Sequence, residues 1–267
     1  MKWKFYSLAF VAGMSILTAC SSDDNNDNDG NGGNGNGNEI ENGTILKGTI
    51  TSDVTLAAGN TYKLSGEYIV EEGATLHIEE GVKIIAVYDD IADYILVKQG
   101  GKINAVGTPD KPIVMTSEKE EPGAWGGIHI CGRAHSKGIS ERGGAVYGGN
   151  DDADNSGTLQ YIRLEYTGFA FDEEHEANGI SFYGVGNGTI VDHCQAYKGS
   201  DDGFEFFGGS VNVSNLVAVS CSDDSFDWTE GWNGKGTNLV AYQEAESTLG
   251  YDCDCLMECD NNGSNNA

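Results

Sequence analysis

The sequence predicts an all-β fold, a single-stranded parallel β-helix in which short strands stack from coil to coil. The first observation is a column of similar segments at offsets of 22 and 23 residues: HCQAY at 193–197, NLVAV at 215–219 and NLVAY at 238–242. The second is a column that aligns ISF at 180–182 with FEF at 204–206, FDW at 226–228 and MEC at 257–259. A solenoid that stacks strand on strand needs such periods, whereas a β-sandwich does not.

The N-terminal segment is predicted to be a lipoprotein signal peptide. Lys2 and Lys4 precede an apolar run over 5–17, which is shorter than the ~20 residues that a membrane-spanning helix needs. The sequence LTAC at 17–20 resembles the bacterial lipobox, in which the signal is cut before a cysteine that then receives lipid. We therefore expect residues 1–19 to be removed and Cys20 to be the lipidation site that anchors the protein to the outer membrane.

Residues 20–43 are predicted to be a disordered tether after the lipidated cysteine. Asn, Gly and Asp dominate this segment, and after Cys20 its one aliphatic residue is Ile40. Ordering such a chain would cost conformational entropy with almost no apolar surface to bury. The acidic run SSDDNNDND at 21–29 looks like the surface-export signal of Bacteroidota lipoproteins, so we expect the folded part to be exposed at the cell surface.

From Thr44 onward, short apolar alternations interrupted by glycine predict the coils of the β-helix. The chain has 39 Gly and only 3 Pro, which fits many tight turns. The segment YIVEEGATLHIEEGVKII at 68–85 indicates three short strands. The side chains expected to point inward are Ile69, Leu76, Ile78, Val82 and Ile84.

Several blocks of the predicted β-helix resemble one known family. The blocks are TYKLSGEYIVEEGATLHIEEGVKI at 61–84, AWGGIHICGRA at 124–134, DDGFEFFGG at 201–209 and DDSFDWTEGW at 223–232. They look like signature blocks of β-helical surface lipoproteins that are abundant in Bacteroidota and similar to a leptospiral outer-membrane lipoprotein. The resemblance covers 44–267 and implies a right-handed β-helix, a lipid anchor and surface exposure. It supplies no catalytic residues.

The end of the chain departs from that family. Family members usually continue beyond a segment like DNNGSNNA at 260–267, and no capping helix is apparent after Leu256. An uncovered last coil leaves an unpaired strand edge. We therefore expect the β-helix of residues 44–267 to be C-terminally incomplete.

The charge of the chain limits its partners. The formal net charge is −27, and both nucleic acid and anionic lipid surfaces require basic proteins. We therefore expect no nucleic-acid partner. Cations, glycans and other proteins remain as candidate partners.

Two acidic stretches, SDDGFEFFGG at 200–209 and SDDSFDWTEG at 222–231, align at the 22-residue offset. Strand alternation directs the aromatic residues of both stretches inward, namely Phe204 and Phe206 in the first and Phe226 and Trp228 in the second. It directs Glu205 and Asp227 outward, and neighbouring coils lie ~4.8 Å apart. The same alignment pairs Asp201 with Asp223 and Asp202 with Asp224, and it places Glu258 next in the column. Because adjacent like charges are destabilising, something must offset them.

Three explanations of how the repulsion between these carboxylates is compensated remain open. The turn aspartates could accept hydrogen bonds from turn amides. The carboxylates could bind Ca²⁺, which takes six to eight oxygen ligands; no cofactor is certain, and calcium is the candidate. The carboxylates could also be catalytic, as in an inverting glycosidase or a polysaccharide lyase. Lys198 and Lys235 are the nearby candidate bases, and the G-H-G and R-I-K segments of polygalacturonases are absent.

A second calcium pattern is DADNSG at 152–157. Asp152 and Asp154 occupy the first and third positions of a D-x-D-x-S-G loop. The twelfth position, however, is Arg163, where an EF-hand has a bidentate glutamate. The two aspartates are therefore the weaker candidate metal ligands.

Aromatic side chains provide the candidate ligand-binding residues. Trp232 and Tyr183 are not obviously inward, and aromatic faces beside acidic oxygens suit sugar rings. We therefore expect a surface lipoprotein that binds a glycan or a protein, with a carbohydrate-active enzyme as the alternative. Among the cysteines, we expect Cys131, Cys194 and Cys221 to be buried thiols, while 253–259 holds the obvious disulfide cluster.

Overall fold

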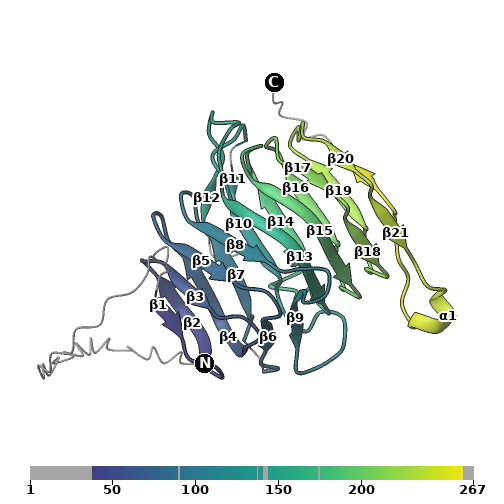
Figure 1. Ribbon diagram of the computed structural model, residues 1–267. Helices are drawn as coiled ribbons and strands as arrows, with labels where there is room; N and C mark the ends of the chain where they lie inside the picture. Colours follow the sequence, from purple (N-terminus) through teal and green to yellow (C-terminus); the bar gives the residue numbers. More distant parts are fainter. Residues whose placement is uncertain (1–37, 90, 137, 141–143, 174, 261–267) are drawn as a thin grey trace, which may run out of the picture. The chain divides into compact units, whose positions relative to one another are not determined.

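Figure 1 shows the computed structural model, in which strands follow one another in successive coils. The structure describes residues 38–89, 91–136, 138–140, 144–173 and 175–260. Strand pairing forms a 20-stranded sheet, and all of its pairs are parallel. This confirms the predicted parallel β-helix. The predicted signal peptide and Cys20 lie outside the described residues.

Three parallel stacks, named A, B and C, make up this sheet, and each coil contributes one strand segment to each stack. Stack A contains β1 (Asn38–Ile40), β3 (Val54–Leu56), β5 (Thr75–Ile78), β8 (Lys102–Val106), the first halves of β13 (Gly157–Glu165) and β15 (Ile190–Tyr197), β17 (Asn212–Ser214) and β20 (Gly236–Thr237).

Stack B contains the first halves of β2 (Ile45–Ile50) and β4 (Thr61–Val70), then β6 (Lys83–Ala86), β9 (Ile113–Ser117), the second halves of β13 and β15, β18 (Val217–Val219) and β21 (Val240–Tyr242). Stack C contains the second halves of β2 and β4, then β7 (Tyr94–Val97), β10 (Ile128–Cys131), β14 (Ile180–Tyr183), β16 (Phe204–Phe207), β19 (Phe226–Thr229) and β22 (Glu258–Cys259).

Two strands and one helix lie outside the stacks. β11 (Gly138–Ile139) and β12 (Val146–Tyr147) pair antiparallel in an insertion between β10 and β13. A short helix, α1 (Glu246–Leu249), connects β21 to β22. None of the helices among the described residues has the length and apolar character needed to cross a membrane.

The register of the stacks confirms both predicted columns. Ala196 pairs with Ala218, which pairs with Ala241 in stack B. In stack C, Glu205 pairs with Asp227, which pairs with Glu258. Periodicity in the sequence therefore predicted the register, because one period is one coil.

The main core fills the space inside the three stacks. Phe182 and Phe206 stack at 5.0 Å between ring centroids, and Phe204 and Phe226 stack at 5.6 Å. All four rings are at most 2% exposed. The predicted inward direction of the aromatic pairs in β16 and β19 is confirmed, and these rings carry much of the buried apolar area of the later coils.

A second, outer cluster covers the outward face of stack C in its middle coils. Its buried members are Ile69, Tyr94, Leu96, Cys131, Ala145, Tyr147 and Tyr183. The expectation that Ile69 points inward is wrong, because Tyr68 and Val70 on either side of it face the core. Side chains of the β11–β12 insertion cover the outward residues, so β10 and β14 are buried on both faces.

Left-handed corner residues join stack A to stack B. Tyr161, His193, Asn215 and Asn238 have φ between 51 and 54° and occupy equivalent places in successive coils. The Asn215 amide donates to Asp192 Oδ1 at 2.7 Å and accepts from Asn238 at 3.0 Å. Asparagine tolerates this backbone conformation better than most residues, so it suits a repeated corner.

The first coil begins inside the segment predicted to be the tether. Strand β1 pairs with β3, with Ile40 opposite Leu56. The Ile40 side chain packs against the core, and its carbonyl accepts a hydrogen bond of 3.0 Å from the Tyr62 hydroxyl. The single aliphatic residue of the tether is therefore a core residue of coil one.

The six described cysteines are free thiols. Cys131, Cys194 and Cys221 are buried, as predicted, and burial raises the pKa of each thiol to about 12. These thiols fill space in the core and are poor nucleophiles.

Candidate cation site

Three strands of stack C carry a column of carboxylates. Glu205 on β16, Asp227 on β19 and Glu258 on β22 are neighbours in the parallel register. Alternation directs them away from the core, because Phe204 and Phe226 occupy the inward positions just before the first two.

The turns before β16 and β19 add two more carboxylates. One oxygen of Asp202 accepts the Asp224 backbone N–H at 2.9 Å, and one oxygen of Asp224 accepts the Cys255 N–H at 2.8 Å. These turn hydrogen bonds are the first of the three ways, considered from the sequence, in which the repulsion between carboxylates could be compensated. They hold each aspartate in place but satisfy only one of its oxygens.

Five of these residues form one acidic cluster: Asp202, Glu205, Asp224, Asp227 and Glu258. Carboxylate oxygens of Asp202, Glu205 and Asp227 lie within 4.8 Å of one another, and those of Asp224, Asp227 and Glu258 do the same. A third group of the same tightness joins Asp202 to Asp201 and Asp223. The structure therefore brings together the six candidate metal ligands of the two acidic stretches: Asp201, Asp202, Glu205, Asp223, Asp224 and Asp227.

The acidic cluster is more buried than its outward direction suggests. Asp202 is 6% exposed, Asp224 is 2% exposed and Asp227 is 9% exposed. The Oδ1 atom of Asp227 has no hydrogen-bond partner among the described residues and is shielded from solvent. A buried carboxylate oxygen without a partner is costly, so this atom is the strongest sign that the cluster accommodates a ligand.

Asn178 is a neighbour of the cluster that sequence reasoning missed. Its side-chain amide donates to Glu205 Oε2 at 2.7 Å and to Ser181 Oγ at 3.0 Å, while its Oδ1 has no partner among the described residues. It occupies the turn position of Asp202 and Asp224 one coil earlier, as the Gly179 N–H bond to the Asp202 carbonyl shows. The alignment of ISF with FEF already places Asn178 level with Asp202, but a neutral amide does not stand out in a column of carboxylates.

Burial and neighbouring carboxylates raise the pKa values of three members of the cluster, Asp202, Asp227 and Glu258. Burial, followed by the charge of Asp201, raises the pKa of Asp202 well above its usual range, and burial is also the main cause for Asp227. A hydrogen bond with the Asp224 carboxylate and the charge of that group raise the pKa of Glu258 to about 7. Carboxylates that resist ionisation together need positive charge or protons.

The described part of the chain provides little positive charge for the cluster. No salt bridge between described residues involves Asp202, Asp224, Asp227 or Glu258. Lys198, a candidate base, pairs with Glu244 at 3.0 Å. Lys235, the other candidate, is an exposed residue in the segment before β20.

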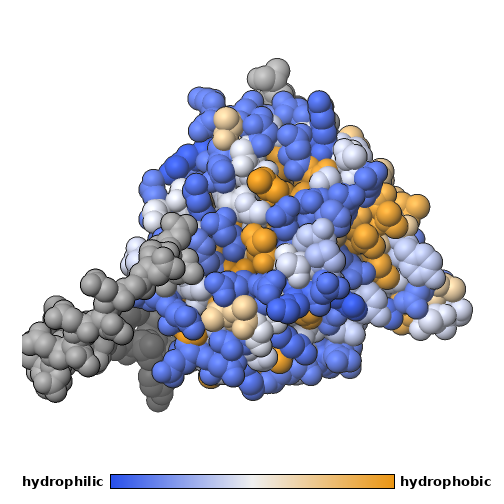
Figure 2. Space-filling model, viewed as in Figure 1, coloured by the Kyte–Doolittle hydropathy of each residue, from blue (hydrophilic) through white to orange (hydrophobic). Residues whose placement is uncertain are grey.

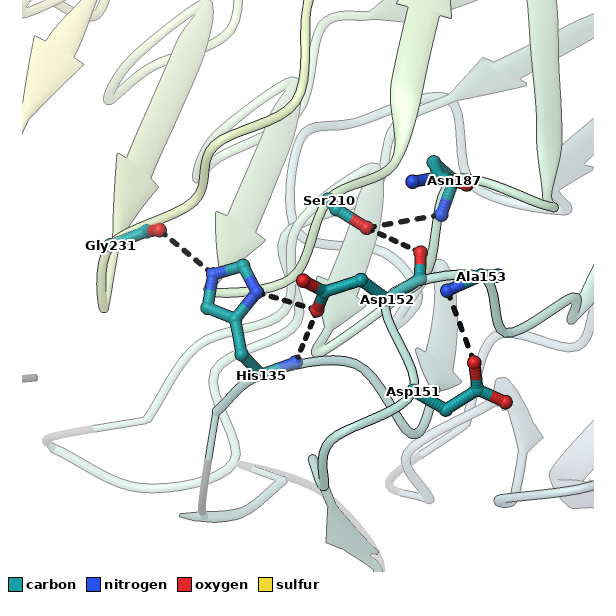
Figure 3. Close-up of polar contacts among 7 residues, drawn as sticks. All are labelled: His135, Asp151, Asp152, Ala153, Asn187, Ser210 and Gly231. Carbon is teal, nitrogen blue, oxygen red and sulfur yellow. Dashed lines mark hydrogen bonds and ion pairs between the residues drawn. The ribbon is translucent and has the colours of Figure 1, made fainter. Parts of the chain in front are cut away.

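Asp152 and Asp154 lie apart from the acidic cluster. Asp152 accepts from the His135 ring at 2.8 Å and from the His135 backbone at 3.0 Å, and the other ring nitrogen of His135 lies 3.0 Å from the Gly231 carbonyl (Figure 3). Asp154 accepts from Ser156 at 3.2 Å. The loop carboxylates therefore brace the insertion, and their geometry does not support the predicted calcium loop.

The same residues do not form a serine hydrolase site. Ser210 lies near Asp152 and His135 in Figure 3, but its hydroxyl donates to the Asp152 backbone carbonyl at 2.7 Å and accepts from the Asn187 N–H. Both ring nitrogens of His135 are occupied by other acceptors, so no nitrogen is free to take a serine proton.

The two predicted ligand-binding aromatics are not exposed platforms. Tyr183 is 1% exposed and stacks on Phe207 at 4.5 Å, so the expectation of an accessible ring is wrong; the insertion covers it. Trp232 is half-buried, stacks on Phe206 at 4.6 Å and donates its indole N–H to the Val211 carbonyl. Trp232 therefore closes the core at a turn.

An exposed apolar surface lies instead on the outward face of stack B. Figure 2 shows apolar residues gathered over β18 and β21. Tyr197, Val219 and Tyr242 are register neighbours there, and Tyr242 is 58% exposed. The Arg163 guanidinium lies 5.0 Å from the Tyr197 ring centroid and the Lys198 ammonium 5.2 Å from it. We call Tyr197, Val217, Val219, Val240 and Tyr242 the stack B patch.

Comparison with protein-family models matches residues 48–267 to a family described as a pectate-lyase-like beta helix domain. No curated protein and no solved structure matches the chain significantly.

Proposed function

Since the chain belongs to the pectate-lyase-like beta-helix domain family, we propose that it is a surface-anchored β-helix that binds a glycan and holds calcium at its acidic cluster. The anchor rests on the sequence alone, through the lipobox at Cys20 and the acidic tether. The calcium site rests on the geometry of stack C.

One observation carries the cation site: Asp227 Oδ1 is buried and unpartnered within two groups of carboxylates. Burying an unpaired negative group is expensive, and the described residues offer no salt-bridge partner for Asp227. A bound cation would satisfy the oxygen and lower the repulsion around it.

The donor set favours calcium over other metals. All ligating groups of the cluster are carboxylates, with the Asn178 Oδ1 nearby, and no thiol or imidazole belongs to the three groups. Hard oxygen donors suit Ca²⁺ and Mg²⁺, and flexible placement over successive coils suits the larger ion with its irregular coordination.

The stack B patch supports the glycan ligand. Its strand face is flat and repeats from coil to coil, with tyrosine rings two coils apart at Tyr197 and Tyr242. Repeated aromatic and apolar side chains present faces on which the rings of an extended sugar chain can lie. The chain's net charge of −27 favours a neutral glycan over an acidic one, unless cations bridge the two.

The competing function is a carbohydrate-active enzyme, a polysaccharide lyase or an inverting glycosidase. The family description and the adjacent carboxylates favour it. A lyase also needs a base beside the cation. Lys198 is engaged by Glu244, so we consider binding the better supported function.

Calcium titration by calorimetry and a screen of neutral and acidic polysaccharides test the proposal. We expect calcium to bind the wild type and to bind far more weakly to the E205Q/D227N double variant. The matched control is D110N/E120Q, which removes two exposed carboxylates away from the cluster. Its calcium binding should equal that of the wild type.

The calcium site, the glycan-binding patch and the choice of binding over catalysis are each tested separately. Equal calcium binding in the double variant and the control would reject the cation site. Substitution of Tyr242 by Ala should weaken glycan binding without changing calcium binding, and unchanged glycan affinity would reject the patch. Release of unsaturated or reducing sugars from any polysaccharide would replace binding with catalysis.

A further inference from the structure

We propose that the acidic cluster holds two neighbouring divalent cations bridged by the carboxylate of Asp227. The inference rests on the proposed function, and it specifies how many ions the site takes and which residue they share.

Asp227 is the one member common to two of the carboxylate groups. In the first, its oxygens lie within 4.8 Å of oxygens from Asp202 and Glu205, one coil earlier. In the second, they lie within 4.8 Å of oxygens from Asp224, at the turn before the same strand, and from Glu258, one coil later. Two cation positions therefore lie on opposite sides of the same side chain.

The spacing of the coils suits two ions. Neighbouring strands of a parallel stack lie ~4.8 Å apart, and paired metal ions bridged by a carboxylate lie roughly 3.5–4 Å apart. A cation between the β16 and β19 levels and another between the β19 and β22 levels would be separated by about one coil or slightly less. Asp227, on the middle strand, is placed to ligate both.

The unpartnered oxygen supports the bridging role. Asp227 is 9% exposed, and its Oδ1 lacks a partner among the described residues, although the carboxylate also interacts with the Trp228 N–H and with Glu205. A bridging carboxylate needs one oxygen free for each cation or one oxygen shared by both. Asp227 belongs to both carboxylate groups, and among the described carboxylates of the cluster it is the one with a buried oxygen that lacks a partner.

The balance of charge also favours two ions. The five carboxylates of the acidic cluster carry five negative charges when all are ionised. One divalent cation would leave a net charge of about −3 in a partly buried site, whereas two would leave about −1, and uncompensated buried charge is strongly unfavourable.

The third carboxylate group shows no comparable evidence of a bound ion. Asp201, Asp202 and Asp223 lie equally close together, but none of the buried oxygens without a partner among the described residues belongs to these three side chains. The structure therefore assigns two cation positions to the cluster, both dependent on Asp227.

The test is the stoichiometry of Ca²⁺ binding to the full chain, measured by calorimetry and by equilibrium dialysis. We expect two ions for the wild type, one for E205Q, which loses only the first position, and one for E258Q, which loses only the second. D227N should lose both at concentrations that saturate the wild type. D223N, which changes the third group, should keep two.

Thermal melting of each variant in chelator checks that it is folded, so that lost binding is not lost structure. A second readout uses Tb³⁺ with Eu³⁺ as energy acceptor. In the wild type, mixing the two should shorten the terbium lifetime, because the ions would be one coil apart, and E258Q should abolish the shortening.

The outcomes separate the two proposals. One ion in the wild type, with E258Q unchanged, would overturn the bridged pair and leave the calcium function standing. No bound ion in the wild type would overturn both. Two ions in D227N would show that the positions do not share this residue, and would also overturn the bridge.

Discussion

Glu205 and Asp227 are direct neighbours in the parallel register of β16 and β19, yet their environments differ. Glu205 accepts a hydrogen bond of 2.7 Å from Asn178 on the preceding coil. Asp227 is 9% exposed and keeps one oxygen without a partner. The two carboxylates are therefore not interchangeable, and the buried oxygen without a partner belongs to Asp227.

Substitution of Asp227 by Asn should stabilise the protein when no divalent cation is present. Burial raises the pKa of Asp227, so the neutral amide removes an unfavourable charge while keeping the shape. We expect a gain of about 1 kcal/mol, seen as a melting temperature about 2–4 °C higher in chelator. With saturating calcium the order should reverse. A lower melting temperature for D227N in chelator would contradict this account.

Asp93 predicts a pH dependence of stability that is independent of the cluster. It is 1% exposed, one oxygen accepts the Gly66 N–H at 2.5 Å, and the other has no partner among the described residues. Burial raises its pKa from 3.8 to about 6. The folded state therefore binds the Asp93 proton more tightly than the unfolded state does. The stabilisation that comes from this proton is complete below about pH 4 and is lost as the pH rises through about 6.

D93N should keep the acceptor for Gly66 and remove the buried charge. We expect urea denaturation to show a gain of about 2 kcal/mol over the wild type at about pH 7.5 and almost none at about pH 4. The control is D89N, an exposed neighbour, which should show a much smaller pH-dependent difference. An equal gain for D93N at both pH values would rule out the charge as its cause.

Two substitutions of the corner residue Asn215, N215G and N215A, should destabilise the protein by different amounts. Its φ is 53°, and its side chain donates to Asp192 and accepts from Asn238. N215G keeps the backbone conformation and loses only the hydrogen bonds, for about 1 kcal/mol. N215A adds the strain of a left-handed alanine, for about 2 kcal/mol or more in total. Equal costs in chemical denaturation would show that the corner conformation is not strained.

Coil register could be predicted from the sequence because the fold repeats. Each coil places equivalent residues in one column, so the offset between Glu205 and Asp227 is itself the pairing. The inward aromatics followed from strand alternation for the same reason. These features depend on neighbouring coils, and neighbouring coils are adjacent in the sequence.

Burial on the outward face could not be predicted in this way. Tyr183 lies against Tyr147 of the β11–β12 insertion, and Ile69 belongs to the same outer cluster. Asp227 is shielded although it points away from the core. The insertion has no period that would align it with the column it covers. Asn178 was missed for a different reason: the alignment of ISF with FEF places it level with Asp202, but its side chain is a neutral amide in a column of carboxylates.

The contact between the β11–β12 insertion and the turn after β19 should weaken as the pH rises. Glu230 accepts hydrogen bonds from Ser136 and from Tyr147, and His135 lies between the Asp152 carboxylate and the Gly231 carbonyl. Burial lowers the pKa of His135, but these two acceptors outweigh it and raise the pKa above 6.5. The protonated ring can donate to both, whereas the neutral ring can donate to only one.

Because the folded-state pKa of His135 is raised, its contribution is complete below the unfolded pKa and is lost as the pH rises through the folded value. We expect amide exchange of 144–149, corrected for intrinsic rates, to be several-fold faster at about pH 8.5 than at about pH 6. H135Q cannot titrate, so its corrected exchange should change little with pH, and E230A should be fast at both values. Exchange in β14 and β16 should stay slow in all three proteins. Equal pH dependence in the wild type and H135Q would show that another group controls the insertion.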